Sequence, residues 1–263
     1  MPLLSITSLD DPCVAPYRLL KGRDPAIELG LFIVESELLV RRLLQSSYET
    51  ASILATDRMA AKLLPDVPAD VPLYACPEPV LHGILGFPFH RGVMACAVRP
   101  AADRVSIDAL AEARRIVAFP FPSAQENLGL ILRSIAGLGA EGVLIGSGGA
   151  DVFSRQAVRV SAGTLFKLPL AICRDAAGDL RRLREERGMK LIAATLSPRA
   201  VPLHTFVPPA SWALVVGNEF EGVPAELEAI CDHEVTIPMQ RGVDSLNVAV
   251  ATSIVLYELL RPR

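Results

Sequence analysis

The chain has 263 residues, of which 51% are hydrophobic and 21% charged, and its formal net charge is −3 at pH 7. These proportions are typical of a globular protein with one large core or two smaller ones, and they exclude disordered and fibrous proteins. The weak negative charge excludes a uniformly basic surface, so a nucleic acid would have to bind a local patch.

The sequence begins with MPLLSITSLDDP, which lacks the basic head and apolar core of a secretory signal. The apolar run near the C-terminus is shorter than the ~20 residues that span a bilayer. Five cysteines without a Cys-x-x-Cys pair suit a reducing compartment, and neither they nor the four histidines show metal-ligand spacing. We expect a cytoplasmic protein with no membrane partner and no metal ion.

The first hundred residues predict a small α/β unit. LFIVESELLVRRLL has the pattern of a strand followed by an amphipathic helix, and ASILATD, PLYAC and GVMACAV have the pattern of further strands. The next segment is polar at its start and has no strand pattern, which predicts a linker. We therefore divide the chain into residues 1–100, a linker at 101–111 and a second domain at 112–263.

The second domain is predicted to have an α/β fold with a mostly parallel sheet. Its apolar strands IVAF, GVLIG, KLIAAT, WALVVG and EVTIP are separated mostly by helix-sized segments. Such alternation is typical of a parallel sheet with helices on both faces. Ligands of these sheets bind beyond the carboxyl ends of the strands, so the segments after the strands are where chemistry is expected.

The segment after IVAF contains NLGLILRS, which has helical spacing with one apolar face. Arg133 projects from the opposite side of this helix, and Asn127 stands near its start. The segment after WALVV is GNEFEG, in which Glu219 lies between glycines that permit close backbone approach to a ligand. Considered one at a time, Arg133 is explained as a solvated arginine, Asn127 as a helix N-cap and GNEFEG as a surface turn.

The segment after EVTIP ends in a helix of small and branched apolar residues, beginning SLNVAVA. Ser245 is explained as the N-cap of this helix, since Ser is favoured there. Asn247 is not explained in this way, because Asn competes with the backbone for hydrogen bonds inside helices. Polar groups in a first turn also suit a ligand surface, where free N–H groups and the helix dipole already point.

A nucleotide-dependent oxidoreductase is one alternative, because GSGGA follows the strand GVLI. However, Gly146, Gly148 and Asp151 do not complete the Gly-x-Gly-x-x-Gly pattern of a dinucleotide loop. The acidic residue expected at the end of the next strand is also not evident. The broken pattern disfavours this function.

Taken together, the three segments resemble the SpoU/TrmH branch of the SPOUT class, which are S-adenosylmethionine-dependent RNA ribose 2′-O-methyltransferases. Asn127, Gly129 and Arg133 resemble the first motif of that family, GNEFEG the second, and IPM with SLNVAVA the third. SAGTLFKLP at 161–169 also resembles a family segment. In the first hundred residues the likeness is weaker, because Ser36 stands where Gly is usual and Arg91 where Gln is usual.

The resemblance implies a C-terminal domain with a deep trefoil knot, preceded by an RNA-binding domain similar to a ribosomal-protein fold. It implies a homodimer that binds S-adenosylmethionine and methylates ribosomal or transfer RNA. The cofactor-binding residues that it implies are Thr195, Gly217, Ile237, Met239 and Leu246. The catalytic residues that it implies are Asn127, Arg133, Glu219, Ser245 and Asn247.

The expected reaction moves a methyl group from a sulfonium to a ribose oxygen, so the enzyme must align the groups and help remove the 2′-hydroxyl proton. The resemblance assigns that step to Arg133. Because a guanidinium is normally always charged, Arg133 acts either as an unusually desolvated base or by stabilising the developing alkoxide. A protein that binds RNA and keeps the cofactor pocket without turnover is the remaining alternative.

Overall fold

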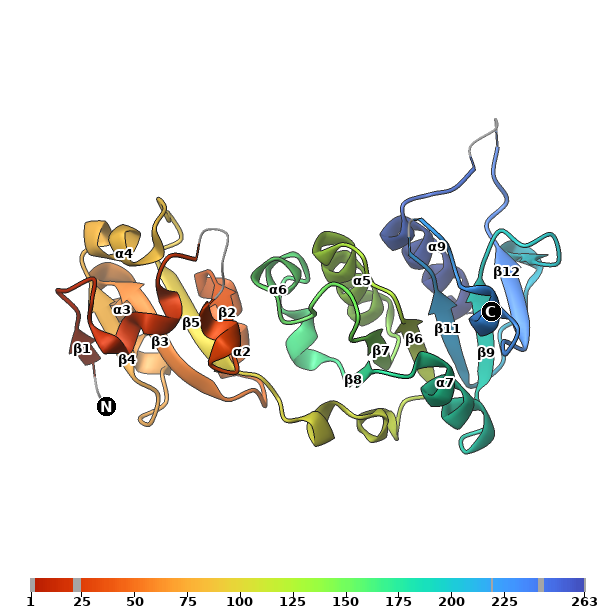
Figure 1. Cartoon of the computed structure of the whole chain (residues 1–263), viewed down its shortest axis with the longest axis horizontal. Coiled ribbons are helices and arrows are strands. Elements are labelled where there is room, and N and C mark those ends of the chain that lie inside the picture. The colour runs from red at the N-terminus through yellow and green to blue at the C-terminus, as the bar shows by residue number, and fades with distance from the viewer. Residues whose placement is uncertain (1–2, 21–24, 219, 241–243, 263) are drawn as a thin grey trace. The chain divides into compact units, whose positions relative to one another are not determined.

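The computed structural model describes residues 3–20, 25–218, 220–240 and 244–262 (Figure 1). The chain divides into two compact units, one of Met1–Pro100 with Phe153–Phe166 and the other of Ala101–Val152 with Lys167–Arg263. Each unit has its own sheet and its own core. None of the helices within the described ranges is long and apolar enough to cross a membrane.

The first unit is built on a five-stranded mixed sheet with strand order β1-β4-β3-β5-β2. β4 pairs in parallel with β1 and β3, whereas β5 is antiparallel to β3 and β2. The four strands predicted for this region are confirmed, and β1 is an additional edge strand of three exposed residues that the sequence pattern did not indicate. Its elements are β1 Leu3–Ser5, α1 Pro25–Glu28, β2 Leu31–Glu35, α2 Glu37–Leu44, β3 Thr50–Thr56, α3 Asp57–Leu63, β4 Leu73–Cys76, α4 Glu78–Leu85, β5 Val93–Val98 and α6 Arg155–Val160.

Tyr17 anchors the N-terminal segment in the core of this unit. Its buried hydroxyl donates to the backbone oxygen of Ser52 at 2.9 Å, lies 2.8 Å from the Ser52 hydroxyl, and accepts from the backbone N–H of Cys96 at 3.1 Å. Burial raises the pKa of Tyr17 well above its ordinary value. The phenol therefore stays neutral and serves as a structural hydrogen-bonding group.

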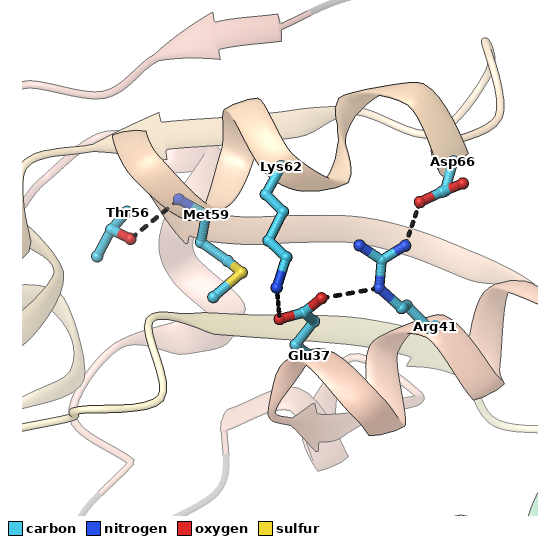
Figure 2. A network of polar contacts seen from close by, with 6 residues as sticks. All are labelled: Glu37, Arg41, Thr56, Met59, Lys62 and Asp66. Atoms are coloured by element: carbon cyan, nitrogen blue, oxygen red, sulfur yellow. Dashed lines mark hydrogen bonds and ion pairs between the residues drawn. The ribbon is translucent and has the colours of Figure 1, made fainter.

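A network of polar side chains joins α2 to α3 on the surface of the first unit (Figure 2). The Glu37 carboxylate accepts from Lys62 at 2.6 Å and from Arg41 at 3.0 Å, and Arg41 also bonds to Asp66. Hydrogen bonds from Lys62 and then Arg41 lower the pKa of Glu37. The start of α3 is capped by Thr56, whose hydroxyl accepts from the backbone N–H of Met59 at 3.4 Å. These contacts join α2, which packs against β2 and β5, to α3, which packs against β3 and β4.

Residues 153–166 join the first unit although they follow β7 in the chain. Phe153 and Phe166 lie against Phe32 of β2, with ring centroids 5.0 and 6.4 Å away. Glu35, which is buried, pairs with Arg155 at 3.0 Å. The division predicted from sequence, at 1–100, 101–111 and 112–263, did not anticipate this exchange, because it followed strand patterns and the aromatic contacts join distant positions.

Both departures from the family pattern in the first unit lie next to Glu35. Arg91, in the position of the usual Gln, pairs with Glu35 at 3.2 Å. Ser36, in the position of the usual Gly, has φ 86° and ψ 151°. That region of backbone conformation is essentially restricted to glycine, so Ser36 is strained.

The second unit is built on a seven-stranded sheet with strand order β10-β12-β9-β11-β6-β7-β8, and all pairings between its described strands are parallel. The five predicted strands are confirmed, while the short β8 and β10 are additional. The elements are β6 Arg115–Phe119, α5 Gln125–Leu138, β7 Gly142–Gly146, β8 Leu170–Cys173, α7 Ala176–Glu185, β9 Lys190–Ala194, β10 Val201–Pro202, β11 Trp212–Val216, α8 Ala225–Glu228, β12 His233–Thr236 and α9 Val248–Leu260.

Both faces of this sheet are buried, as expected for a parallel sheet. On one face Ala213 and Val215 of β11 share a core with Leu180 and Leu183 of α7. The alternate residues of β11 are also buried, and α5 packs against β7. Residues 101–111, predicted as a linker, form two short 3-10 helices, of which the second buries Leu110 in the same core.

Candidate active site

A pocket of about 770 Å³ lies beyond the carboxyl ends of three adjacent strands of the second unit. Most of its wall is formed by residues 194–197 at the end of β9, 216–218 and 220–225 at the end of β11, and 235–237 with Met239 at the end of β12. One side of α9 closes it with Val248, Ala251, Thr252 and Val255. The pocket is therefore at the sheet edge where the sequence pattern predicted a ligand.

The loop after β11 approaches itself so closely that only glycine fits at residue 217. A Cβ on Gly217 would lie 1.9 Å from the carbonyl carbon of Gly222 and 2.3 Å from the nitrogen of Val223. The turn is held by Asn218, whose Oδ1 accepts from the backbone N–H groups of Phe220 at 2.9 Å and Glu221 at 2.8 Å. Glu219, which the resemblance places in the catalytic site, lies outside the described residues.

The head of α9 is capped by Asn247 and not by Ser245, so the N-cap predicted at Ser245 is wrong. The Asn247 Oδ1 accepts from the backbone N–H groups of Ala249 at 2.9 Å and Val250 at 3.3 Å. This capping uses the acceptor of the amide and leaves its donor free to bond elsewhere. Ser245 and Leu246 come just before the cap, where they are exposed and line the pocket.

Asn127 and Asn247 are brought together although 120 residues separate them. The Asn247 Nδ2 donates to the Asn127 Oδ1 at 3.0 Å, which joins the first turn of α5 to the cap of α9. The N-cap position of α5 is Ala124, so the explanation of Asn127 as a helix N-cap is wrong. Its side chain serves this contact between two motifs.

Arg133 stands apart from that pair. It follows Asn127 by six residues, about 9 Å along a helix axis. Its side chain is exposed, does not line the pocket, and has no hydrogen-bond or ion-pair partner within the described parts of the chain. A single chain therefore does not bring Arg133 into the pocket.

The five residues expected to bind the cofactor all line this one pocket. They are Thr195, Gly217, Ile237, Met239 and Leu246. They come from three loops and a helix head that are separated in the sequence, so their convergence is a property of the fold. Their contacts with a ligand remain a prediction.

Glu228, the last residue of α8, also lines the pocket, and the sequence analysis did not identify it. The Thr195 hydroxyl donates to its Oε1. Glu221 and Glu228 are the two ionisable side chains among the described residues of the wall, and both are acidic. An isolated Glu in a short helix carries no sequence signal of this kind, because its role depends on Thr195 of a different loop.

Comparison with known proteins agrees with this geometry. Residues 114–257 match the SpoU rRNA Methylase family, and the chain belongs to that family. An uncharacterized tRNA/rRNA methyltransferase of Mycobacterium tuberculosis is 37% identical over 260 residues, covering 96% of this chain and 90% of the relative. The 23S rRNA (guanosine-2′-O)-methyltransferase RlmP of Bacillus subtilis is 27% identical, with coverage of 97% and 98%.

The fold is shared with a solved member of the family. The SpoU methyltransferase AviRb from Streptomyces viridochromogenes superposes with a TM-score of 0.79 at 25% identity, covering 94% of this chain and 96% of that one. The same protein has also been solved in complex with AdoMet, with a TM-score of 0.79 at 24% identity and coverage of 94% and 97%.

Proposed function

We propose that this protein transfers a methyl group from S-adenosylmethionine to a ribose 2′-hydroxyl of ribosomal or transfer RNA. The observation that carries the proposal is the convergence of three family motifs on one pocket and on the Asn127–Asn247 contact beside it. The family match and the relatives named as RNA 2′-O-methyltransferases support the same reaction.

The pocket suits S-adenosylmethionine in size, shape and charge. Ile237 and Leu246 offer apolar contacts to an adenine, beside the tight turn that Gly217 permits. The carboxylates of Glu221 and Glu228 suit a cationic ligand. When bound, the cofactor supplies a methyl group that is already activated on a sulfonium.

The residues of the chain supply alignment and charge. Ser245, beside the pocket, and the paired Asn127 and Asn247 side chains form a polar surface where the target ribose binds and its 2′-oxygen is oriented. Arg133 stabilises negative charge on that oxygen as its proton leaves to water. We assign it this role and not that of a base, because a guanidinium is normally always charged and the Arg133 side chain is exposed.

We propose a homodimer, formed through the outer side of α9. Val250, Ile254 and Tyr257 follow one another at helical spacing and are 49%, 39% and 63% exposed. An exposed apolar strip of this kind is typical of an interface. Arg133 lies on α5, which packs beside α9 through the 2.7 Å contact of Ser134 with Ser253. A second copy covering this strip would place Arg133 next to the partner.

The finer features that the resemblance implies belong to the same proposal. The first unit supplies affinity for RNA, and the segments around the pocket form the trefoil knot of the SPOUT class. Two features support the knot: α9 packs on α5, and the strands between them in the chain are not in sequence order within the sheet. With ribosomal or transfer RNA as substrate, the protein acts in the cytoplasm.

The test combines titration with S-adenosylmethionine and mapping of methylated riboses in RNA from a strain that lacks the protein. We expect binding of the cofactor and the loss of one ribose methylation, restored by the wild-type protein. Binding of cofactor and RNA with every ribose still methylated would indicate the alternative of a binding protein without turnover.

A further inference from the structure

We propose that the Glu228 carboxylate accepts hydrogen bonds from N–H or O–H groups of S-adenosylmethionine, and that Thr195 is a positioning residue that orients this carboxylate. The inference rests on the proposed function, because it assigns a role within the same pocket. It also changes the role expected for Thr195, which the resemblance implied to be a direct cofactor ligand.

The donor of the Thr195 hydroxyl is engaged within the protein. Thr195 directly follows β9, and its backbone N–H donates to the oxygen of Val235 at 3.0 Å. Its hydroxyl donates its one proton to Glu228 and accepts from the backbone N–H of Ser197 at 3.2 Å. A hydroxyl has a single donor, so this side chain cannot also donate to a ligand.

The carboxylate of Glu228 retains capacity for a ligand. Its Oε1 accepts from Thr195, whereas its Oε2 has no hydrogen-bond partner among the residues that the structure describes. The side chain is half-buried in the pocket wall, and an ionised carboxylate can only accept. A donor placed at Oε2 would form a charge-assisted hydrogen bond.

The charges of the pocket favour the same class of ligand. Its described wall contains the carboxylates of Glu221 and Glu228 and no lysine or arginine. S-adenosylmethionine offers a cationic sulfonium, a cationic ammonium and the two hydroxyls of its ribose. Each of these is favoured next to a carboxylate, and a phosphate is not. Glu221 is exposed, so the half-buried and oriented Glu228 is the better acceptor.

A purely structural role for the Thr195–Glu228 contact is the competing explanation. The segment after α8 is already tied to neighbouring elements without Glu228. Arg184 donates to the oxygen of Ile230 at 2.8 Å, and Asp232 accepts from the N–H of Leu191 at 2.9 Å. The position of α8 therefore does not depend on the Glu228 side chain.

The experiment is calorimetric titration of the full chain with S-adenosylmethionine, S-adenosylhomocysteine and 5′-methylthioadenosine. Glu228→Gln is the test variant, and Glu226→Gln is the matched control, since Glu226 is exposed on the same helix and does not line the pocket. We expect Glu228→Gln to weaken S-adenosylmethionine binding by about 10- to 100-fold, the range for a hydrogen bond to a charged group. Glu226→Gln should bind as the wild type does.

The three ligands identify the donor. An equal loss for all three indicates the ribose hydroxyls, and a loss confined to the two ligands with an amino-acid part indicates the ammonium. A loss for S-adenosylmethionine alone indicates charge attraction to the sulfonium, which has no hydrogen-bond donor, and overturns the inference. Unchanged affinity for all three overturns the inference. If the wild-type chain itself does not bind S-adenosylmethionine, the proposed function fails instead.

Thr195→Val tests the positioning role. We expect a weaker loss than for Glu228→Gln, and no further loss when Thr195→Val is added to Glu228→Gln, because the first acts only through the second. Additive losses would overturn the positioning role. If Glu228→Gln does not fold, Glu228→Asp replaces it, since the shorter side chain keeps the charge but withdraws it from the pocket. Wild-type affinity in Glu228→Asp would then overturn the inference.

Discussion

Gly217→Ala should remove cofactor binding while leaving most of the fold intact. The added Cβ would lie 1.9 Å from the carbonyl carbon of Gly222, 2.1 Å from its oxygen and 2.3 Å from the nitrogen of Val223. All three are backbone atoms, so no flexible side chain can move aside. Reaching the 3.4 Å of ordinary contact requires the two sides of the turn to separate by roughly 1.5 Å.

The substitution should disturb the pocket more than it destabilises the fold. Overpacking of this kind costs about 1–3 kcal/mol of stability, which the second unit can lose without unfolding. The displaced turn carries residues 217–218 and 220–225 of the pocket wall, so a shift exceeding 1 Å removes their fit to a ligand. We expect affinity for S-adenosylmethionine to fall by at least about 100-fold, or roughly 2.7 kcal/mol.

The assay is calorimetric titration of folded variants, with circular dichroism and thermal unfolding on the same samples. Gly137→Ala is the control, because Gly137 lies in α5 and a Cβ there meets nothing within 4 Å. That substitution should leave binding unchanged and add about 0.5–1 kcal/mol of stability. A folded Gly217→Ala protein with wild-type affinity would show that the close approach of Gly217 and Gly222 does not shape the cofactor site.

Three further substitutions test other parts of the argument. Arg133→Ala should lower single-turnover methylation by roughly 10²- to 10⁴-fold with nearly unchanged cofactor affinity, and Arg133→Lys should restore little; a wild-type rate in Arg133→Ala would remove the catalytic assignment. Leu246→Asp should weaken cofactor binding, measured by titration, by several kcal/mol, on the order of the cost of desolvating a carboxylate. Leu246→Met should bind the cofactor normally, and equal affinities of the two variants would contradict contact of Leu246 with the ligand. Ser36→Gly should relieve about 1–3 kcal/mol of backbone strain in the folded state, while the greater freedom of glycine in the unfolded chain should cost about 0.5–1 kcal/mol. Calorimetry should therefore show a higher unfolding temperature, and a lower one would refute the strain.

Strands of the core could be predicted from sequence because burial imposes continuous apolar runs on them. β6, β7, β9 and β11 have such runs. β1 and β10 could not be predicted, because two or three mostly exposed residues at a sheet edge leave no hydrophobic pattern. β8 has the apolar sequence LAIC, yet the sequence analysis did not identify it as a strand.

Site residues could be predicted where they lie together in a short sequence motif. The motifs gave the residues of the pocket loops, but not the hydrogen bond from Asn247 to Asn127, which depends on how α9 packs on α5. The cap of α9 was misplaced by two residues because Ser245 and Asn247 are both good caps, and the backbone of the preceding loop decides between them. Glu228 was missed because its partner Thr195 lies in the loop after β9, far away in the sequence.

The exchange of residues 153–166 means that the chain passes between the two units three times, at 100–101, 152–153 and 166–167. No single cut separates them. A fragment that starts at residue 112 would carry Phe153 and Phe166 without Phe32, their aromatic neighbour in the intact chain, and would expose both rings to water. Grafting the first unit onto a related enzyme would likewise require both stretches, 1–100 and 153–166.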